Sequence, residues 1–148
     1  MVVRRWLLDT CVLSETFRPQ ADAGVVRWLT QNGNQAAVSA VTLGELQYGL
    51  ERIAPSRHRN ALQAWFEAMH LRYAPHSLPS DAAVWAHWAR IKASLEVMGR
   101  RQEDLDILIA ATASAHGLTL VTRNTRHFID TGVPLINPWG GADAASTE

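Results

Sequence analysis

Residues 104–122, DLDILIAATASAHGLTLVT, predict a helix, a glycine turn and a buried strand in direct succession. Two aspartates open the helical part, where the helix dipole favours negative charge. Gly117 stands just past the last turn, where a left-handed residue commonly ends a helix. The apolar, partly β-branched run Leu118–Thr122 then has the length and composition of a short strand. This order of elements is typical of α/β folds.

The rest of the chain repeats this alternation of strand-like runs and segments with helical spacing. The strand-like runs are Val2–Leu8, Ala36–Ala40, Tyr73–Ala74 and Val133–Ile136. The helical segments are Val12–Phe17, Asp22–Gln31, Thr42–Ile53, Arg57–Arg72 and Ser80–Gly99. Strands that alternate with helices across short turns form parallel sheets covered on both faces. We therefore predict an α/β fold with three α/β/α layers, in which helices flank a small, mostly parallel sheet.

The length and composition bound the organisation of the chain. Its 148 residues suit one domain and are too few for two well-packed ones. We predict one domain over 1–139 and a disordered tail over 140–148, because the residues after Trp139 have little to pack. No apolar run approaches the length of a membrane span, and the first one breaks at Asp9, too early for a signal peptide. A soluble, cytoplasmic protein is the expectation.

Several classes of protein are excluded or disfavoured by composition. Cys11 is the only cysteine, so the chain has neither an intrachain disulfide nor a cysteine zinc cluster. The histidines include no His-Glu-x-x-His pair and no glycine-rich phosphate loop occurs, which disfavours zinc hydrolases and nucleotide-binding domains. Because 14 Lys and Arg balance 14 Asp and Glu, binding to nucleic acid requires a local basic patch.

Acidic residues stand at the ends of three predicted elements. Asp9 follows the first strand, and ligands of open α/β sheets bind outside the carboxyl ends of the strands. A buried carboxylate needs a partner, and capping of the next helix is the structural alternative. Glu45 stands three residues after Thr42, which is the spacing of a capping box. Asp104 and Asp106 suit the start of their helix by charge alone. Each acid taken singly therefore has a structural explanation.

The acids taken together point to chemistry. If folding gathers Asp9, Glu45 and Asp106, their mutual repulsion raises at least one carboxyl pKa and destabilises the empty site. Mg²⁺ relieves that repulsion, because it prefers oxygen ligands and binds through a few carboxylates plus retained water. Such an ion acidifies water and neutralises charge on a phosphate. The three acids therefore predict hydrolysis of phosphodiester bonds.

Four segments, in order along the chain, resemble the motifs of one family. They are Leu7–Glu15 (LLDTCVLSE), Ser39–Leu46 (SAVTLGEL), Asp106–Ala113 (DILIAATA) and Leu120–Asn124 (LVTRN). Through them the chain resembles the PIN-domain family, and within it the VapC/FitB-like toxins of type II toxin–antitoxin systems. One such motif alone is a weak indication, whereas four in register across most of the chain are specific.

The resemblance implies a role for each acid. Asp9, Glu45 and Asp106 correspond to the catalytic and metal-binding acids of the family. Thr10 corresponds to a residue that helps position the site beside Asp9 and contacts substrate. Asp106 matches better than Asp104, because the acid of the family stands three residues before the Ile of Ile-Ala-Ala-Thr-Ala. Asp104 remains an accessory or alternative ligand.

The chain departs from the family at the fourth acid. Many PIN domains carry an aspartate where this sequence has Asn124 or His127. Asn124 still offers a carbonyl oxygen as an accessory ligand or a substrate contact, whereas His127 suits Mg²⁺ less well. Arg123 and Arg126 are candidates to hold flanking phosphates of the substrate, with solvated side chains as the alternative.

The resemblance also implies an activity and partners. The expected protein is a Mg²⁺-dependent endoribonuclease, with Mn²⁺ as an alternative cofactor, that leaves a 5′-phosphate and a 3′-hydroxyl. The expected partners are an RNA substrate, a VapB-like antitoxin that blocks the acidic site, and a second copy of the chain. Aromatic surface between Arg57 and Met98 is a candidate contributor to that homodimer.

Other functions are weighed against this one. A haloacid-dehalogenase-like phosphatase needs an aspartate where Cys11 stands, and a response-regulator receiver needs a late lysine, whereas the only lysine is Lys92. Two alternatives stay open: a catalytically weak PIN module that binds RNA or a protein partner, and a PIN nuclease of RNA processing. Metal-dependent cleavage that is lost in Asp9→Asn argues against the first. Growth arrest rescued by a co-encoded protein argues against the second.

Overall fold

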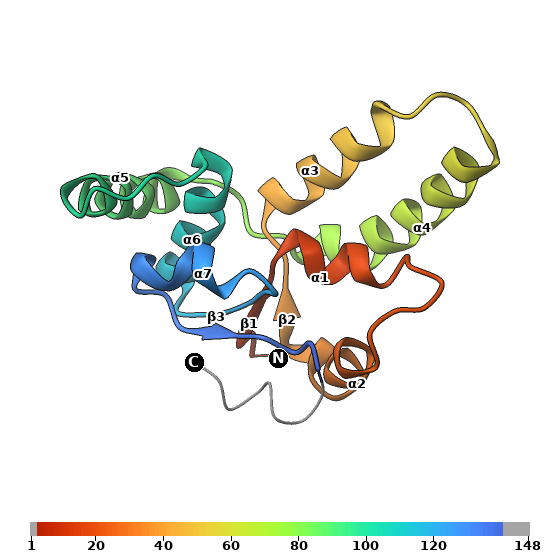
Figure 1. The fold of residues 1–148 in the computed structure, drawn as a ribbon, viewed down its shortest axis with the longest axis horizontal. Coiled ribbons are helices and arrows are strands. Elements are labelled where there is room, and N and C mark those ends of the chain that lie inside the picture. Colours follow the sequence, from red (N-terminus) through yellow and green to blue (C-terminus); the bar gives the residue numbers. More distant parts are fainter. Residues whose placement is uncertain (1–2, 141–148) are drawn as a thin grey trace.

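Four short parallel strands form the centre of the computed structural model, which describes residues 3–140. They are β1 (Trp6–Leu8), β2 (Ala36–Ala37), β3 (Thr119–Val121) and β4 (Leu135–Ile136), in the order β2-β1-β3-β4. The first strand of the chain lies in the middle of the sheet beside β3, with Leu7 opposite Leu120 (Figure 1). The small parallel sheet predicted from the sequence is confirmed.

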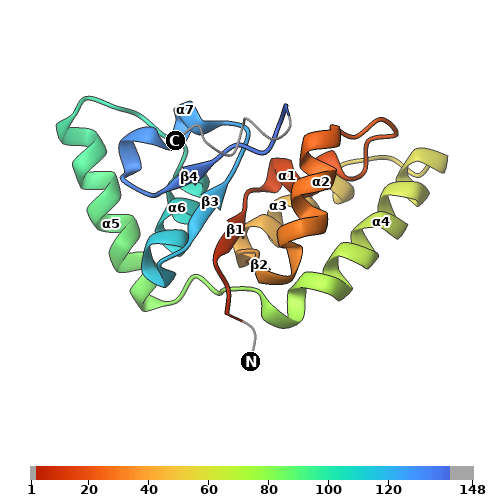
Figure 2. The same ribbon diagram turned by 90° about the horizontal axis from the view of Figure 1, so that it is seen from below.

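Helices cover both faces of this sheet (Figure 2). One face carries α1 (Thr10–Glu15), α2 (Ala23–Asn32), α3 (Ala40–Glu51) and α4 (Arg57–Tyr73). The other carries α6 (Asp104–His116) and α7 (Thr125–Phe128), with α5 (Ala82–Val97) packed against α6. The three-layer α/β/α arrangement is therefore confirmed.

The alternation of side chains along β1 explains why two helical layers are needed. Leu8 points to one face and packs in a cluster with Val12 of α1 and Leu50 of α3. Leu7 points to the opposite face and packs with Ile109 of α6. Both leucines are fully buried, and burial of each contributes about 2 kcal/mol. Because neighbouring strands alternate in the same way, each face of the sheet has its own core.

The predicted strand at Tyr73–Ala74 is wrong. The apolar spacing of α4 continues to Tyr73, whose side chain is buried, so the helix runs through this position. A 3₁₀ turn, η2 (Ala74–His76), follows it. Extended pairing resumes at Leu78, which forms a parallel bridge with Ser39 just beyond β2.

The predicted helices are present with small shifts at their ends. α1 begins two residues earlier than predicted because Asp9 caps it, and α3 begins at Ala40 because Ser39 caps it. α6 has its predicted bounds, and Gly117 ends it in the left-handed conformation with a φ of 64°. Within residues 3–140, no helix is both long and apolar enough to cross a membrane. The predicted tail lies outside the described residues, except for Gly140.

Candidate active site

Asp9 lies at the carboxyl end of β1 and is only 6% exposed. Its Oδ1 accepts a hydrogen bond from the backbone N of Thr10 at 2.8 Å, which caps α1. Its Oδ2 accepts one from the Thr122 hydroxyl at 2.8 Å, directly after β3. These bonds compensate for the burial of a charged group. The structural alternative for Asp9 is therefore confirmed, and the same side chain is also held across the sheet.

Glu45 reaches the same edge of the sheet from the second turn of α3. Its Oε1 accepts a hydrogen bond of 2.5 Å from the Thr10 hydroxyl, which places it beside Asp9. The capping-box explanation for Glu45 is wrong, because the N-cap of α3 is Ser39, whose Oγ accepts from the backbone N of Thr42 at 3.2 Å. Glu45 therefore does not cap α3, and its carboxylate bonds to Thr10 of α1 instead.

Asp106 is the third acid and lies half-buried in the first turn of α6. Its pKa is raised, first by burial and then by the negative charges of Asp9 and Glu45. His127 acts in the opposite direction and lowers the pKa of Asp106. The charges that act on Asp106 come from separate elements, because Asp9 follows β1, Glu45 lies in α3 and His127 lies in α7. The charges of Asp9 and Glu45 therefore act on Asp106, and the hydrogen bonds from Thr122 and Thr10 hold two of the three acids at one edge of the sheet.

The segment after β3 supplies the remaining side chains at this edge. The backbone N of Asn124 donates to the Thr122 hydroxyl at 3.0 Å, which ties the start of α7 to the bond that holds Asp9. Arg123 is exposed, and its guanidinium lies over the ring of Trp139 with 5.5 Å to the ring centroid. Arg126 is also exposed, on α7. Positive charge therefore lies beside the acids on the surface of this edge.

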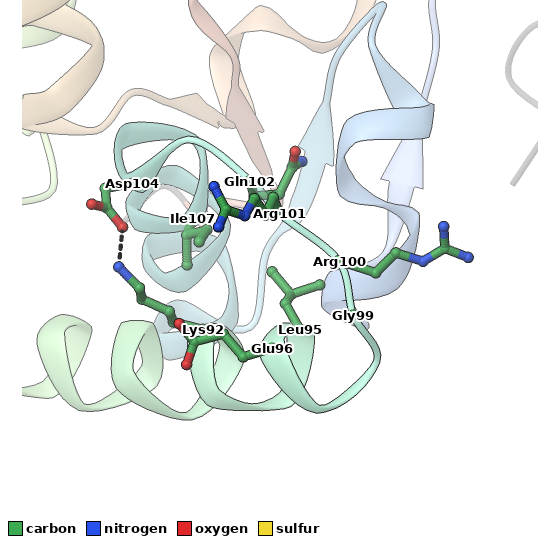
Figure 3. A pocket seen from close by; sticks show the side chains of 9 residues that line it. All are labelled: Lys92, Leu95, Glu96, Gly99, Arg100, Arg101, Gln102, Asp104 and Ile107. Carbon is green, nitrogen blue, oxygen red and sulfur yellow. Dashed lines mark hydrogen bonds and ion pairs between the residues drawn. The ribbon is translucent and has the colours of Figure 1, made fainter.

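Asp104 takes part in an ion pair on the surface. Its carboxylate pairs with the Lys92 ammonium of α5 at 2.7 Å (Figure 3). Both side chains line a cavity of about 410 Å³ at the α5–α6 turn, together with Arg101 and Gln102. The ion pair engages the Asp104 carboxylate with α5, and its accessory role at the metal site stays a prediction.

The side chains at this edge provide the oxygen ligands that a cation such as Mg²⁺ prefers, but they do not enclose an ion on all sides. Among residues 3–140, no three His, Cys, Asp or Glu side chains stand close enough to hold one ion directly. Asp9 and Glu45, whose charges act on Asp106, are nevertheless carboxylates, and the hydroxyls of Thr10 and Thr122 beside them add further oxygen atoms. Mg²⁺ keeps several waters and binds through one or two carboxylates. The residues therefore fit a hydrated divalent ion.

Sequence reasoning gave no role to Thr122, although it holds Asp9 in place. It is fully buried and follows β3 as Asp9 follows β1, so its position at the same sheet edge is the feature that identifies it. Cys11 also lies here, with its thiol 3.5 Å from Asp9 Oδ2. Burial and the Asp9 charge raise the pKa of Cys11 to about 11, so the thiol stays protonated and donates to the carboxylate.

Comparison with known proteins gives a consistent result. Residues 6–133 match the family described as PIN domain. Toxin FitB of Neisseria gonorrhoeae is 37% identical over 135 residues, which are 90% of this chain and 97% of that protein. VapC ribonuclease Y4jK of Sinorhizobium fredii is 34% identical over 135 residues, 90% of this chain and 96% of that protein. The crystal structure of FitAcB from Neisseria gonorrhoeae matches with a TM-score of 0.84 and 36% identity, over 91% of this chain and 99% of that one.

Proposed function

The chain belongs to the PIN-domain family, and from that premise we propose that it is a metal-dependent endoribonuclease, the toxin of a VapBC-like toxin–antitoxin pair. Relatives named as a toxin and as a ribonuclease cover nine-tenths of the chain, which supports one activity for the whole domain. The observation that carries the proposal is the pair of hydrogen bonds by which the hydroxyls of Thr10 and Thr122 hold the carboxylates of Glu45 and Asp9 at one edge of the sheet. Repelling carboxylates at the edge of a parallel sheet favour a cation and, with it, an anionic substrate.

We propose Mg²⁺ as the cofactor, with Mn²⁺ as the alternative, bound by Asp9, Asp106 and Glu45 partly through retained water, with Asn124 as an accessory ligand. When bound, such an ion supplies positive charge against the scissile phosphate and makes a water molecule more acidic. The protein itself supplies orientation. Hydrogen bonds from Thr10 and Thr122 hold the carboxylates of Glu45 and Asp9 in fixed rotamers before any ligand arrives.

The surface beside the acids is suited to the RNA chain. The exposed guanidinium of Arg123 rests on Trp139 and is thereby held in place for a phosphate next to the scissile one. Arg126, exposed on the neighbouring helix, is a second candidate for a phosphate contact. Thr10 and Asn124 lie closer to the acids and are the candidates to contact the substrate near the bond that is cut.

Digestion of bulk cellular RNA tests the activity. We expect cleavage with Mg²⁺, no cleavage with EDTA, and fragments with a 5′-phosphate and a 3′-hydroxyl. Asp9→Asn abolishes cleavage, and Glu45→Gln lowers it strongly. Glu51→Gln is the matched control, because Glu51 lies on the same helix but pairs with Arg59 at 3.4 Å on the surface. Intact RNA after treatment with a folded, Mg²⁺-loaded wild type would favour the catalytically weak binding module instead.

The role as a cytoplasmic toxin has a separate test. Expression of the chain in a bacterial cytoplasm is expected to arrest growth, and co-expression of the small protein encoded beside it, a VapB-like antitoxin, is expected to restore growth. Asp9→Asn is expected to remove toxicity, which ties the growth arrest to the acidic site. Cleavage in vitro without growth arrest would point to a nuclease of RNA processing.

A further inference from the structure

We propose that a cavity beside Glu45 receives one unpaired base of the RNA, next to the phosphodiester bond that is cut. The inference rests on the proposed ribonuclease function and names the form of RNA that the site accepts. The cavity has a volume of about 200 Å³ and lies between α1, α3 and α4. Thr10 and Glu45 are among the residues that line it, so the cavity adjoins the candidate active site.

The rest of the lining is mostly apolar and partly aromatic. It consists of Phe17, Leu46, Leu62 and Trp65, together with Ser14 and Gly49. The rings of Phe17 and Trp65 are 5.6 Å apart between centroids and inclined by 55°. The indole N–H of Trp65 donates to the Thr16 hydroxyl at 2.8 Å, which fixes the plane of the larger ring. An oriented aromatic wall beside a phosphate site is suited to a flat ring system.

The size and chemistry of the cavity favour a nucleobase over other occupants. At about 200 Å³ the cavity is smaller than the roughly 300–1,000 Å³ of pockets for larger ligands, so it holds one flat ring system. Bases of single-stranded RNA that stack on Trp and Phe are a common mode of recognition. A base inside a duplex stays stacked on its neighbours and cannot enter. The inference therefore predicts selection of single-stranded RNA at the cut.

Gly49 provides a way to fill the cavity without disturbing the fold. A Cβ atom added there meets nothing within 4 Å, and the residue lies inside α3, where side-chain-bearing residues are more favourable than glycine. Gly49→Leu therefore occupies the space meant for the base, and Gly49→Ala occupies less of it. Gly44→Ala is the matched control, because it is another glycine of α3 with open space at its Cβ position and it does not line the cavity.

The test measures binding of RNA by the full chain in EDTA, where no cleavage occurs. The probe is a short single-stranded RNA copied from the strongest cut in the digest of bulk RNA. A second RNA lacks only the base beside the cut. For the wild type we expect the abasic RNA to bind about tenfold more weakly, in keeping with the contribution of one stacked base. We expect Gly49→Leu to bind the intact RNA about as weakly as the wild type binds the abasic RNA. The affinity of this variant does not fall further with the abasic RNA, whereas Gly44→Ala binds both RNAs as the wild type does.

Two results overturn the inference. One is equal affinity of the wild type for the intact and abasic RNAs, which is the result expected if the cavity takes a side chain of a partner protein instead. The other is that Gly49→Leu binds the abasic RNA more weakly than the intact RNA, so that the losses of affinity from the variant and from the missing base add. The wild-type comparison requires no variant, and Gly49→Ala with intermediate affinity and unchanged or higher thermal stability shows that the effect is not one of folding. If the wild type cuts no RNA with Mg²⁺, the proposed function fails as well.

Discussion

The hydroxyl of Thr122 lies 3.7 Å from the Cys11 thiol and makes two shorter hydrogen bonds that no apolar side chain can replace. It donates to Asp9 at 2.8 Å and accepts from the backbone N of Asn124 at 3.0 Å. Thr122→Val keeps the shape but leaves a buried carboxylate oxygen with a weaker partner and an amide without its acceptor. We expect a loss of about 1–3 kcal/mol in the free energy of unfolding, measured with urea, and a lower rate of RNA cleavage.

Thr119→Val is the control for this prediction. Thr119 lies at the other end of the same strand and is partly exposed. The same chemical change there is expected to alter stability little and to leave cleavage unchanged. Equal losses in the two variants would mean that the strand, and not the bond to Asp9, responds to the substitution.

Asp106 makes the stability of the metal-free protein depend on pH. Its pKa in the folded protein is raised above the 3.8 of a free aspartate, by burial and by Asp9 and Glu45. Below pH 3.8 the carboxyl is protonated in both the folded and the unfolded protein, and the stability that this group contributes is fully present. As the pH rises through the raised pKa, the folded protein must ionise a disfavoured carboxyl, and that stability is lost.

We therefore expect Asp106→Asn to gain thermal stability over the wild type as the pH rises from acid to neutral in EDTA. At neutral pH, added Mg²⁺ should stabilise the wild type more than the variant, because the ion relieves the repulsion only where Asp106 is charged. Thermal melts of both proteins across pH check this. A difference between them that does not change with pH would contradict the crowding of these acids.

At the scale of the element, the start of α3 determines where Glu45 points. Ser39 caps the helix by accepting from Thr42, and this places Glu45 toward Thr10 rather than toward the helix end. Ser39→Ala is expected to lower the free energy of unfolding by about 1 kcal/mol and also to lower cleavage. Ser56→Ala removes the equivalent cap of α4, where Ser56 accepts from Arg59 at 3.0 Å. That variant should lose a similar stability and keep its activity.

The elements differ in how well the sequence predicts them. α6 and its glycine end are specified locally, by charge at the start and Gly117 at the finish, and their bounds are as predicted. The end of α4 is not specified locally, because a single apolar residue such as Tyr73 suits a strand as well as one more turn of a helix. The cap at Ser39 was missed for a similar reason. Thr42 and Glu45 imitate a capping box, and only the position of α1 beside α3 shows that Glu45 bonds elsewhere.

The same limit applies to the site. The acidic residues and their order along the chain are visible in the sequence, because charge at the end of a strand or the start of a helix is a local feature. The partners of those acids are not, since Thr122 and the cavity beside Glu45 exist only once distant elements meet. Asp104 and Asp106 have the same charge at the same helix start, so the sequence alone does not distinguish them. Asp104 forms a surface ion pair only because Lys92 of α5 lies beside it, whereas Asp106 is the candidate site residue.

At the scale of the whole molecule, α5 presents an aromatic surface that suits a second copy of the chain. Trp85 is 46% exposed and lies edge-on to Trp88, with 5.2 Å between ring centroids. If this surface forms the proposed homodimer, Trp85→Ser weakens association by about tenfold or more, because buried tryptophans dominate interfaces. Ile129→Ser, at a residue that is 62% exposed outside α4 and α5, is the control. Sedimentation equilibrium distinguishes them, and a wild type that is monomeric at all concentrations would contradict the dimer.

The pairing of β1 with β3 also determines at what stage of synthesis the candidate active site can form. Asp9 leaves the ribosome early, but the hydroxyl that holds it is synthesised 113 residues later. Until that strand emerges, the nascent chain has no central pair in its sheet and no fixed place for its acids. The proposed nuclease site therefore stays incomplete during most of the chain's own translation and forms only once the last strands appear.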